Sequence, residues 1–465
     1  MRRALAANLA LALLLGGCQS LRPGEAPPPA PVPAAWSAGR GDAGPDGAAA
    51  GLGWREVLVD PRLAELVGIA LDNNRDLRVA VANIRKARAG FEAQRAELSP
   101  AIGVGGAGNL GESVVGSNRL YGLSLASSAY ELDLFGRARD LADAAFAEYL
   151  ASAEARRAVQ INLVADVAAA YYGLAADRER LALARETLAS QQAALGLIRS
   201  TVEAGSSSDL ALAQARTSVE TARGDVAAYA AAVEKDEAAL ALLLGAPVPL
   251  AVPRLAAVRA PAPVPAGLSS VALLRRPDVI QAEHRLRAAD ADIGAARAAF
   301  FPSVTLTAST GLSSRALGGL FAAGTGVWAF APQVNLPIFD GGRLRAGLDA
   351  AVADRDAAVA QYEKAIQAGF REASDALADR ATLGARLSAQ EGLVAAAARS
   401  HELALARFRG GVDSYLAVLD AQRLLYAARQ GLIGVRLARL ANQVALYKAL
   451  GGGWRERSAR VAGRT

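Results

Sequence analysis

Residues 407–423, RFRGGVDSYLAVLDAQR, join two helical patterns through a glycine-centred turn. The first half of the chain contains a counterpart at residues 203–210, EAGSSSDL. The central glycines, Gly205 and Gly411, are 206 residues apart. Glycine readily adopts the left-handed backbone conformation that a tight turn between antiparallel helices requires. The sequence therefore predicts two helical hairpins that turn at Gly205 and Gly411.

The same spacing of 206 residues recurs where both hairpins end, at Leu244-Gly245 and Leu450-Gly451. Before each hairpin, a helical pattern ends at a proline, Pro100 or Pro302, and two stretches of alternating polarity follow. Similarity at one fixed offset indicates a duplicated structural unit. We therefore expect each half to contain a helix, two strands, a long helix, a turn and a second long helix.

The long helices carry a sustained heptad pattern, which is typical of helices that supercoil against neighbours. Six apolar residues of the first long helix recur at every seventh position: Val167, Leu174, Leu181, Leu188, Leu195 and Val202. A helix over residues 137–203 would be roughly 100 Å long at the usual rise per residue. A length of this order suits a tube that crosses an aqueous compartment.

The alternating stretches predict strands with one apolar and one polar face. In the second half, Val304, Leu306 and Ala308 oppose Thr305, Thr307 and Ser309, and Trp328 and Phe330 share a face with Val334, Leu336 and Ile338. In the first half, Tyr130, Leu132 and Leu134 oppose Glu131 and Asp133. This pattern fits either a membrane β-barrel or a half-buried soluble sheet. Four strands cannot close a conducting barrel, whereas three copies of the chain would supply about twelve strands.

The N-terminus has the features of an export signal. Arg2 and Arg3 precede an apolar run, Leu5 to Leu15, which is too short to span a bilayer. Gly16 and Gly17 lead to Cys18, the one cysteine of the chain. Beyond this signal, no continuous apolar stretch is long enough for a transmembrane helix. The predicted organisation is a signal peptide at 1–17, a Pro/Ala/Gly-rich tether at 18–56, a first repeat at 57–250, a Pro-rich connector at 251–266, a second repeat at 267–454 and a tail at 455–465.

Composition and motifs argue against nucleic-acid binding and enzymatic chemistry. The net charge of +6 arises from scattered Lys and Arg among nearly as many Asp and Glu. Residues 103–108 fit the G-x-G-x-x-G pattern, but no helix is expected to open there, so small residues in a sheet explain them better than a dinucleotide site. His284 and His401 lie in different halves without a second ligand at metal-binding spacing. We therefore expect no cofactor, no metal and no enzymatic activity.

These motifs resemble those of the outer-membrane efflux protein family, the TolC-type channels, over about residues 55 to 454. The segment from Leu15 to Cys18 also resembles the lipobox of bacterial lipoproteins, in which the cysteine is acylated. The family resemblance is closest to the lipidated branch that serves resistance-nodulation-division pumps. It implies a homotrimer with a twelve-stranded transmembrane β-barrel in the outer membrane and a long α-helical barrel in the periplasm. It also implies two partners, a periplasmic adaptor and an inner-membrane pump.

The resemblance also implies a gate at the tip of the second hairpin. Leu416 and Asp420 share one helix face, which would form an apolar constriction and an acidic ring in the lumen. Arg409 and Asp413 would make contacts with neighbouring helices at the tip. Some family members carry a second aspartate where this chain has Ala417, so a closure by two stacked aspartate rings is in doubt. The alternative is that Leu416 packs between helices and Asp420 faces solvent.

Two other classes of protein remain open on the sequence. A lipid-anchored periplasmic adaptor or coiled-coil scaffold would have one helical hairpin, whereas this chain has two, separated by strand pairs. A lipid-anchored periplasmic enzyme would need a catalytic constellation, and none is apparent in the sequence. The channel is therefore the favoured function.

Overall fold

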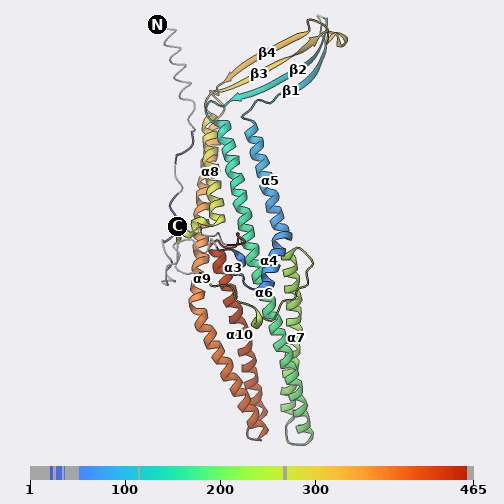
Figure 1. Cartoon of the computed structure of the whole chain (residues 1–465), viewed down its shortest axis with the longest axis vertical. Coiled ribbons are helices and arrows are strands. Elements are labelled where there is room, and N and C mark those ends of the chain that lie inside the picture. The colour runs from blue at the N-terminus through green and yellow to red at the C-terminus, as the bar shows by residue number, and fades with distance from the viewer. Residues whose placement is uncertain are drawn as a thin grey trace, which may run out of the picture. The chain divides into compact units, whose positions relative to one another are not determined.

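The computed structural model describes residues 21–24, 28–33, 36, 52–113, 116–264 and 270–457. The predicted signal peptide and Cys18 lie outside these residues. The first half of the chain contains a short helix, two helices, two strands and two long helices: α3 (Trp54–Val57), α4 (Pro61–Asn73), α5 (Arg75–Ala96), β1 (Gly103–Ser113), β2 (Gly116–Leu132), α6 (Arg137–Glu203) and α7 (Asp209–Leu244). Figure 1 shows these elements in the blue-to-green part of the chain.

The second half repeats this order from α8 onward. Its elements are α8 (Pro277–Ala298), β3 (Ser303–Ser314), β4 (Gly326–Asn335), α9 (Arg343–Arg409) and α10 (Tyr415–Ala449). Short 3-10 helices occupy Leu255–Ala257, Ser270–Arg275 and Leu317–Gly319. The predicted fold class, mainly helical with a small β part and two internal repeats, is confirmed.

The first long helix of each half contains 67 residues. Neither α6 nor α9 contains proline, so nothing in either sequence interrupts the backbone hydrogen bonds. One 18-residue window of α6 is apolar and long enough to cross a membrane, contrary to the expectation that no such stretch follows the signal. Because 61% of that window is buried within the protein, its composition is typical of a core helix.

The chain divides into two compact units, and α6 and α9 contribute residues to both. One unit comprises residues 1–30, 81–154 and 280–365; the other comprises 31–80, 155–279 and 366–465. The first unit holds the sheet and the second holds both hairpin turns.

The sheet is antiparallel with the strand order β1-β2-β3-β4. Val304 pairs with Val334 and Ala308 with Phe330, so the apolar residues of β3 and β4 share one face as predicted. A register shift between Ser127 and Tyr130 places one extra residue in β2. Consequently, the side chains on the apolar face of β2 come from odd-numbered residues such as Leu125 before the bulge and from even-numbered residues after it. Alternation along the sequence does not reveal this shift. The predicted fourth strand also included Leu336 and Ile338, which lie beyond the end of β4 at Asn335.

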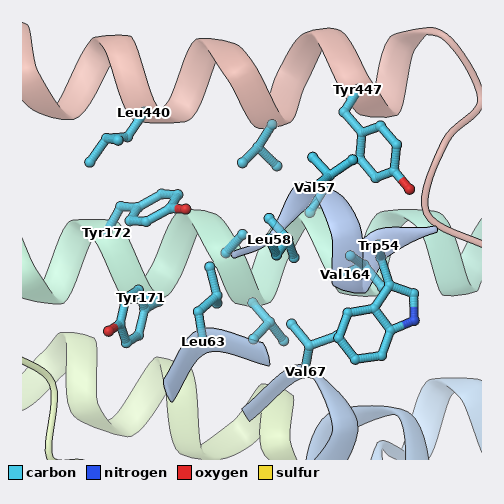
Figure 2. Packing of buried hydrophobic residues seen from close by; sticks show 14 of the residues in the cluster. Trp54, Val57, Leu58, Leu63, Val67, Val164, Tyr171, Tyr172, Leu440 and Tyr447 are labelled. Carbon is cyan, nitrogen blue, oxygen red and sulfur yellow. The ribbon is translucent and has the colours of Figure 1, made fainter. Parts of the chain in front are cut away.

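The largest hydrophobic core lies in the second unit, where α3, α4, α6 and α10 meet (Figure 2). Trp54 and Leu58 are 1% exposed and Leu63 is fully buried. Asp60 caps α4 by accepting hydrogen bonds from the backbone N–H groups of Arg62 and Leu63, at 3.0 and 3.1 Å. The cap satisfies two donors at the start of α4 and so fixes the helix against this core.

Candidate gate at the hairpin tips

Both hairpin turns have the same backbone geometry. Gly205 and Gly411 have φ values of +75° and +70°. Gly205 N–H donates to Val202 O at 2.9 Å, and the next N–H donates to the carbonyl five residues back, also at 2.9 Å. Around Gly411 the two equivalent bonds are each 3.0 Å. This pair of bonds is the Schellman arrangement, in which a left-handed glycine ends a helix.

Side chains from all four long helices form a small apolar cluster near these turns, here called the tip cluster. Its buried members are Ile198, Ala215, Tyr415, Val418 and Leu419. The ring centroids of Phe408 and Tyr415 are 5.4 Å apart with a 57° angle between their planes. Burial raises the pKa of the Tyr415 hydroxyl, which has no hydrogen-bond partner among the residues that the structure describes. The cluster therefore joins the second hairpin to the first by apolar contact.

Leu416 and Asp420 lie on the side of α10 that is not buried in the tip cluster. Leu416 is 45% exposed, whereas its neighbour Tyr415 is 5% exposed. The Asp420 side chain is 65% exposed, and its Oδ1 lies 3.8 Å from the Arg423 guanidinium. Within one chain, both predicted gate residues thus face away from the packed helices.

Asp413, one of the two predicted tip contacts, pairs within its own chain. Its carboxylate accepts two hydrogen bonds from Arg407, at 2.6 and 3.0 Å. This bidentate pair lowers the pKa of Asp413 and raises that of Arg407. Arg409, the other predicted tip contact, is exposed.

Polar contacts hold α10 against the first hairpin above the tip cluster. Tyr426 donates to Asp225 Oδ2 of α7 at 3.0 Å, and Arg429 lies 3.5 Å from Glu186 of α6. Burial, with a smaller effect of the nearby Arg429 charge, lowers the pKa of His401 beside a cavity of about 170 Å³. These contacts join α10 to both helices of the first hairpin.

His284 lies in the first unit, and burial and Arg287 lower its pKa. Among the residues that the structure describes, no group of three or more His, Cys, Asp or Glu side chains could hold a metal ion.

Sequence reasoning missed three residues of the tip: Arg407, Tyr415 and Arg423. Tyr415 has a sequence signal, because it is the first residue of α10 and the one aromatic residue between Phe408 and Tyr426. The Arg407–Asp413 pair follows from the turn itself, since Val412 N–H donates to Arg407 O at 3.0 Å and brings the two side chains together.

Comparison with known proteins identifies the family. A family model described as "Outer membrane efflux protein" matches residues 66–246 and 268–452, which together make up most of the chain. The toluene efflux pump outer membrane protein TtgC of Pseudomonas putida is 47% identical, with 99% of this chain and 98% of that protein aligned. A probable outer membrane lipoprotein of Salmonella typhimurium, SilC, is 39% identical, with 97% and 98% aligned.

A solved structure shows the same fold. The open state of the Neisseria gonorrhoeae MtrE outer membrane channel has a TM-score of 0.85 and 36% sequence identity, covering 95% of this chain and 100% of that one. The family and these relatives are channel proteins of the outer membrane, which sets aside the adaptor alternative. The chain belongs to the outer membrane efflux protein family.

Proposed function

We propose that three copies of this outer-membrane efflux channel close one transmembrane β-barrel. The observation that supports this proposal most strongly is the exposed apolar face of the sheet. Trp328, Phe330 and Val334 alternate along β4 and are 80%, 58% and 67% exposed. A soluble protein rarely exposes a continuous apolar face, whereas a membrane barrel presents one to lipid.

The two edges of the sheet support the trimer. In a single chain, β1 pairs with β2 alone and β4 pairs with β3 alone among the described strands. Unpaired backbone groups are too costly within the hydrocarbon of a bilayer. Pairing β1 of one copy with β4 of the next satisfies both edges and gives about twelve strands, a size known for outer-membrane barrels.

The gate belongs to the second hairpin in this proposal. Three copies of Leu416 narrow the lumen with apolar side chains, and three copies of Asp420 add an acidic ring that attracts cations. The exposure of both residues within one chain supports this role. Arg423 lies beside Asp420 and partly balances its charge, and Ala417 leaves a single acidic ring. Gly205 and Gly411 form the turns, while Arg409 and the Asp413–Arg407 pair lie at the surface that neighbouring chains would contact.

The proposed partners are a periplasmic adaptor and an inner-membrane pump of the resistance-nodulation-division class. Relatives named as parts of efflux pumps support this assignment. The channel conducts drugs or other small molecules passively. A wide lumen needs no binding site for the molecules that pass through it. The proposed boundaries of the two repeats, 57–250 and 267–454, place one hairpin in each.

The proposed lipid anchor is Cys18, acylated after removal of residues 1–17. The relative named as an outer membrane lipoprotein supports this modification. Labelled fatty acid should appear on the unchanged protein and disappear in Cys18→Ala. Label that persists in the variant would exclude Cys18 as the acylated residue.

Assembly and conduction are tested together. The protein should leave the membrane in mild detergent as a trimer whose electrophoretic mobility changes on heating, and the same fraction should conduct ions in planar bilayers. The expected result is conductance in the trimer fraction alone. A monodisperse monomer that conducts ions would contradict barrel closure by three chains.

A further inference from the structure

The N-terminal segment of the chain is docked onto the first unit at Arg22. Arg22 Nε donates to Asp140 Oδ1 at 2.7 Å, and its terminal nitrogen bonds to Asp143. A third contact holds the backbone, because Arg297 donates to Leu21 O at 2.8 Å. The segment therefore contacts both α6 and α8.

The environment of this contact differs from that of an ordinary surface ion pair. The Asp140 side chain is only 2% exposed, whereas those of Arg22 and Asp143 are 31% and 59% exposed. A buried carboxylate requires a cation or hydrogen-bond donors, while a fully exposed pair adds little. Arg22 supplies both the charge and a directed donor to Asp140.

A glycine of α8 makes room for the contact. A Cβ atom at Gly294 would lie 2.1 Å from Asp140 Oδ2 and 2.9 Å from Arg22 Cγ. Glycine inside a helix is intrinsically unfavourable, so its presence here needs a packing reason. The close approach of Arg22 and Asp140 supplies that reason.

The docking point lies beside the ends of two strands. Asp140 is in the first turn of α6, which starts five residues after β2 ends at Leu132. Arg297 is in the last turn of α8, which ends at Ala298, shortly before β3 starts. Figure 1 shows these helix ends at the base of the sheet. In the proposed barrel, this is the level at which the strands leave the membrane on the periplasmic side.

We propose that Arg22, held by Asp140 and Asp143 over Gly294, is the docking residue that fixes the lipid-anchored end of the chain to the base of the barrel. This inference rests on the proposed acylation of Cys18. Cys18 precedes Arg22 by four residues, so its Cα lies within about 14 Å of the Arg22 Cα. The docked arginine thus holds the acyl chains within reach of the inner leaflet of the outer membrane.

A nitroxide spin label at position 24 tests the docking in the full-length protein. No heavy atom lies within 4 Å of a Cβ placed at Gly24, so the Gly24→Cys variant can carry the label without disturbing the contact. Because the label itself meets open space, its spectrum reports the motion of the backbone, and a docked backbone should give a component of reduced mobility, called here the immobilised component. In Arg22→Gln and in Gly294→Ala the immobilised component should be lost, although alanine favours the helix more than glycine does. Arg22→Lys should retain part of it, since one ammonium cannot replace the guanidinium fork.

Two matched variants serve as controls. Arg285→Gln removes an exposed cation from α8, the helix that contains Gly294. Gly90→Ala adds a methyl group to a helical glycine with open space around it. Both should keep the immobilised spectrum. In proteoliposomes, a nickel chelate held at the lipid headgroups should relax the label strongly in the unchanged background and weakly in Arg22→Gln.

The proposal that Arg22 docks the segment is contradicted if the label at position 24 is mobile in the unchanged background. It is also contradicted if the label is equally immobilised in Arg22→Gln. Its placement beside the membrane is overturned if the nickel chelate relaxes both equally. Fatty-acid labelling of the same samples separates this inference from the proposed function. Immobilisation that depends on Arg22, in a protein that carries no fatty acid, would support the docking and overturn the acylation of Cys18.

Discussion

At the tip of the first hairpin the chain turns through Ser206, Ser207 and Ser208, whereas at the second tip it turns through Val412, Asp413 and Ser414. The glycines before these residues have nearly the same φ and the same pair of closing hydrogen bonds. The backbone of the duplicated hairpin has therefore been kept while the side chains around the turn have changed.

The side-chain differences give the second tip a buried aromatic residue and an additional acidic residue that the first tip lacks at the corresponding positions. Tyr415 is buried, but the residue 206 positions earlier, Asp209, is exposed. Asp420 corresponds in the same way to the neutral Gln214. In the proposed function, the first hairpin would act as a rigid frame and the second would carry the gate.

The largest difference between the tips should appear on removing Tyr415. Tyr415→Ala empties a buried position of the tip cluster and should lower the free energy of unfolding by about 3 kcal/mol or more. The matched change in the first hairpin, Asp209→Ala, removes only a carboxylate near a helix N-terminus and should cost about 1 kcal/mol or less. Thermal unfolding of the purified proteins measures both changes.

A second substitution sharpens the same comparison. Tyr415→Phe keeps the ring and removes a buried hydroxyl that lacks a partner within the described part of the chain. The melting temperature should stay the same or rise. A marked fall would mean that a neighbouring chain supplies a hydrogen bond to this hydroxyl in the assembled protein.

The turn glycines should respond alike, because their backbones match. Alanine at Gly205 or Gly411 must adopt the left-handed conformation, which costs about 1–2 kcal/mol at either position. Neither site crowds an added Cβ, so the cost arises from the backbone alone. Equal losses of stability in Gly205→Ala and Gly411→Ala are expected. A much larger loss at one turn would show that the two backbones are not equivalent.

The smallest effect concerns the Arg407–Asp413 pair. Because Arg407 lowers the pKa of Asp413, the pair is present above the ordinary aspartate range and is lost as the pH falls through the lowered pKa. Carboxyl NMR should show the Asp413 pKa returning towards about 3.9 in Arg407→Gln. Arg409→Gln is the matched control and should leave the Asp413 pKa unchanged.

The long helices and their turns could be predicted from the sequence because their signals are local and periodic. The heptad residues Val167 and Leu174 are fully buried, as a supercoiling seam requires. The 206-residue spacing also predicted tight turns at Gly205 and Gly411, and both glycines have positive φ. These features depend on residues that lie close together in the chain, so the sequence carries them directly.

Other features depend on residues far apart or on a single irregular residue. The bulge in β2 is marked by Ala129, a non-glycine residue with φ of +52°, and alternation alone does not reveal such a break. The Arg22–Asp140 contact joins positions 118 residues apart, and no pattern along the chain connects them. Leu416 and Asp420 were predicted as gate residues from the family resemblance. Helical spacing showed only that they share a face, and the exposure of that face depends on the packing of all four helices.

The central claim, that the second tip holds the gate, is tested most directly by single-channel conductance of two double variants. Leu416→Ala with Asp420→Ala should raise the resting conductance at least about twofold and reduce cation preference, because the narrowest section becomes wider and loses its charge. Leu210→Ala with Gln214→Ala makes the corresponding change in the first hairpin and should leave both properties unaltered, with trimers intact in each case. Unchanged conductance and selectivity in the first double variant, or the same change in both, would contradict the assignment of the gate to Leu416 and Asp420.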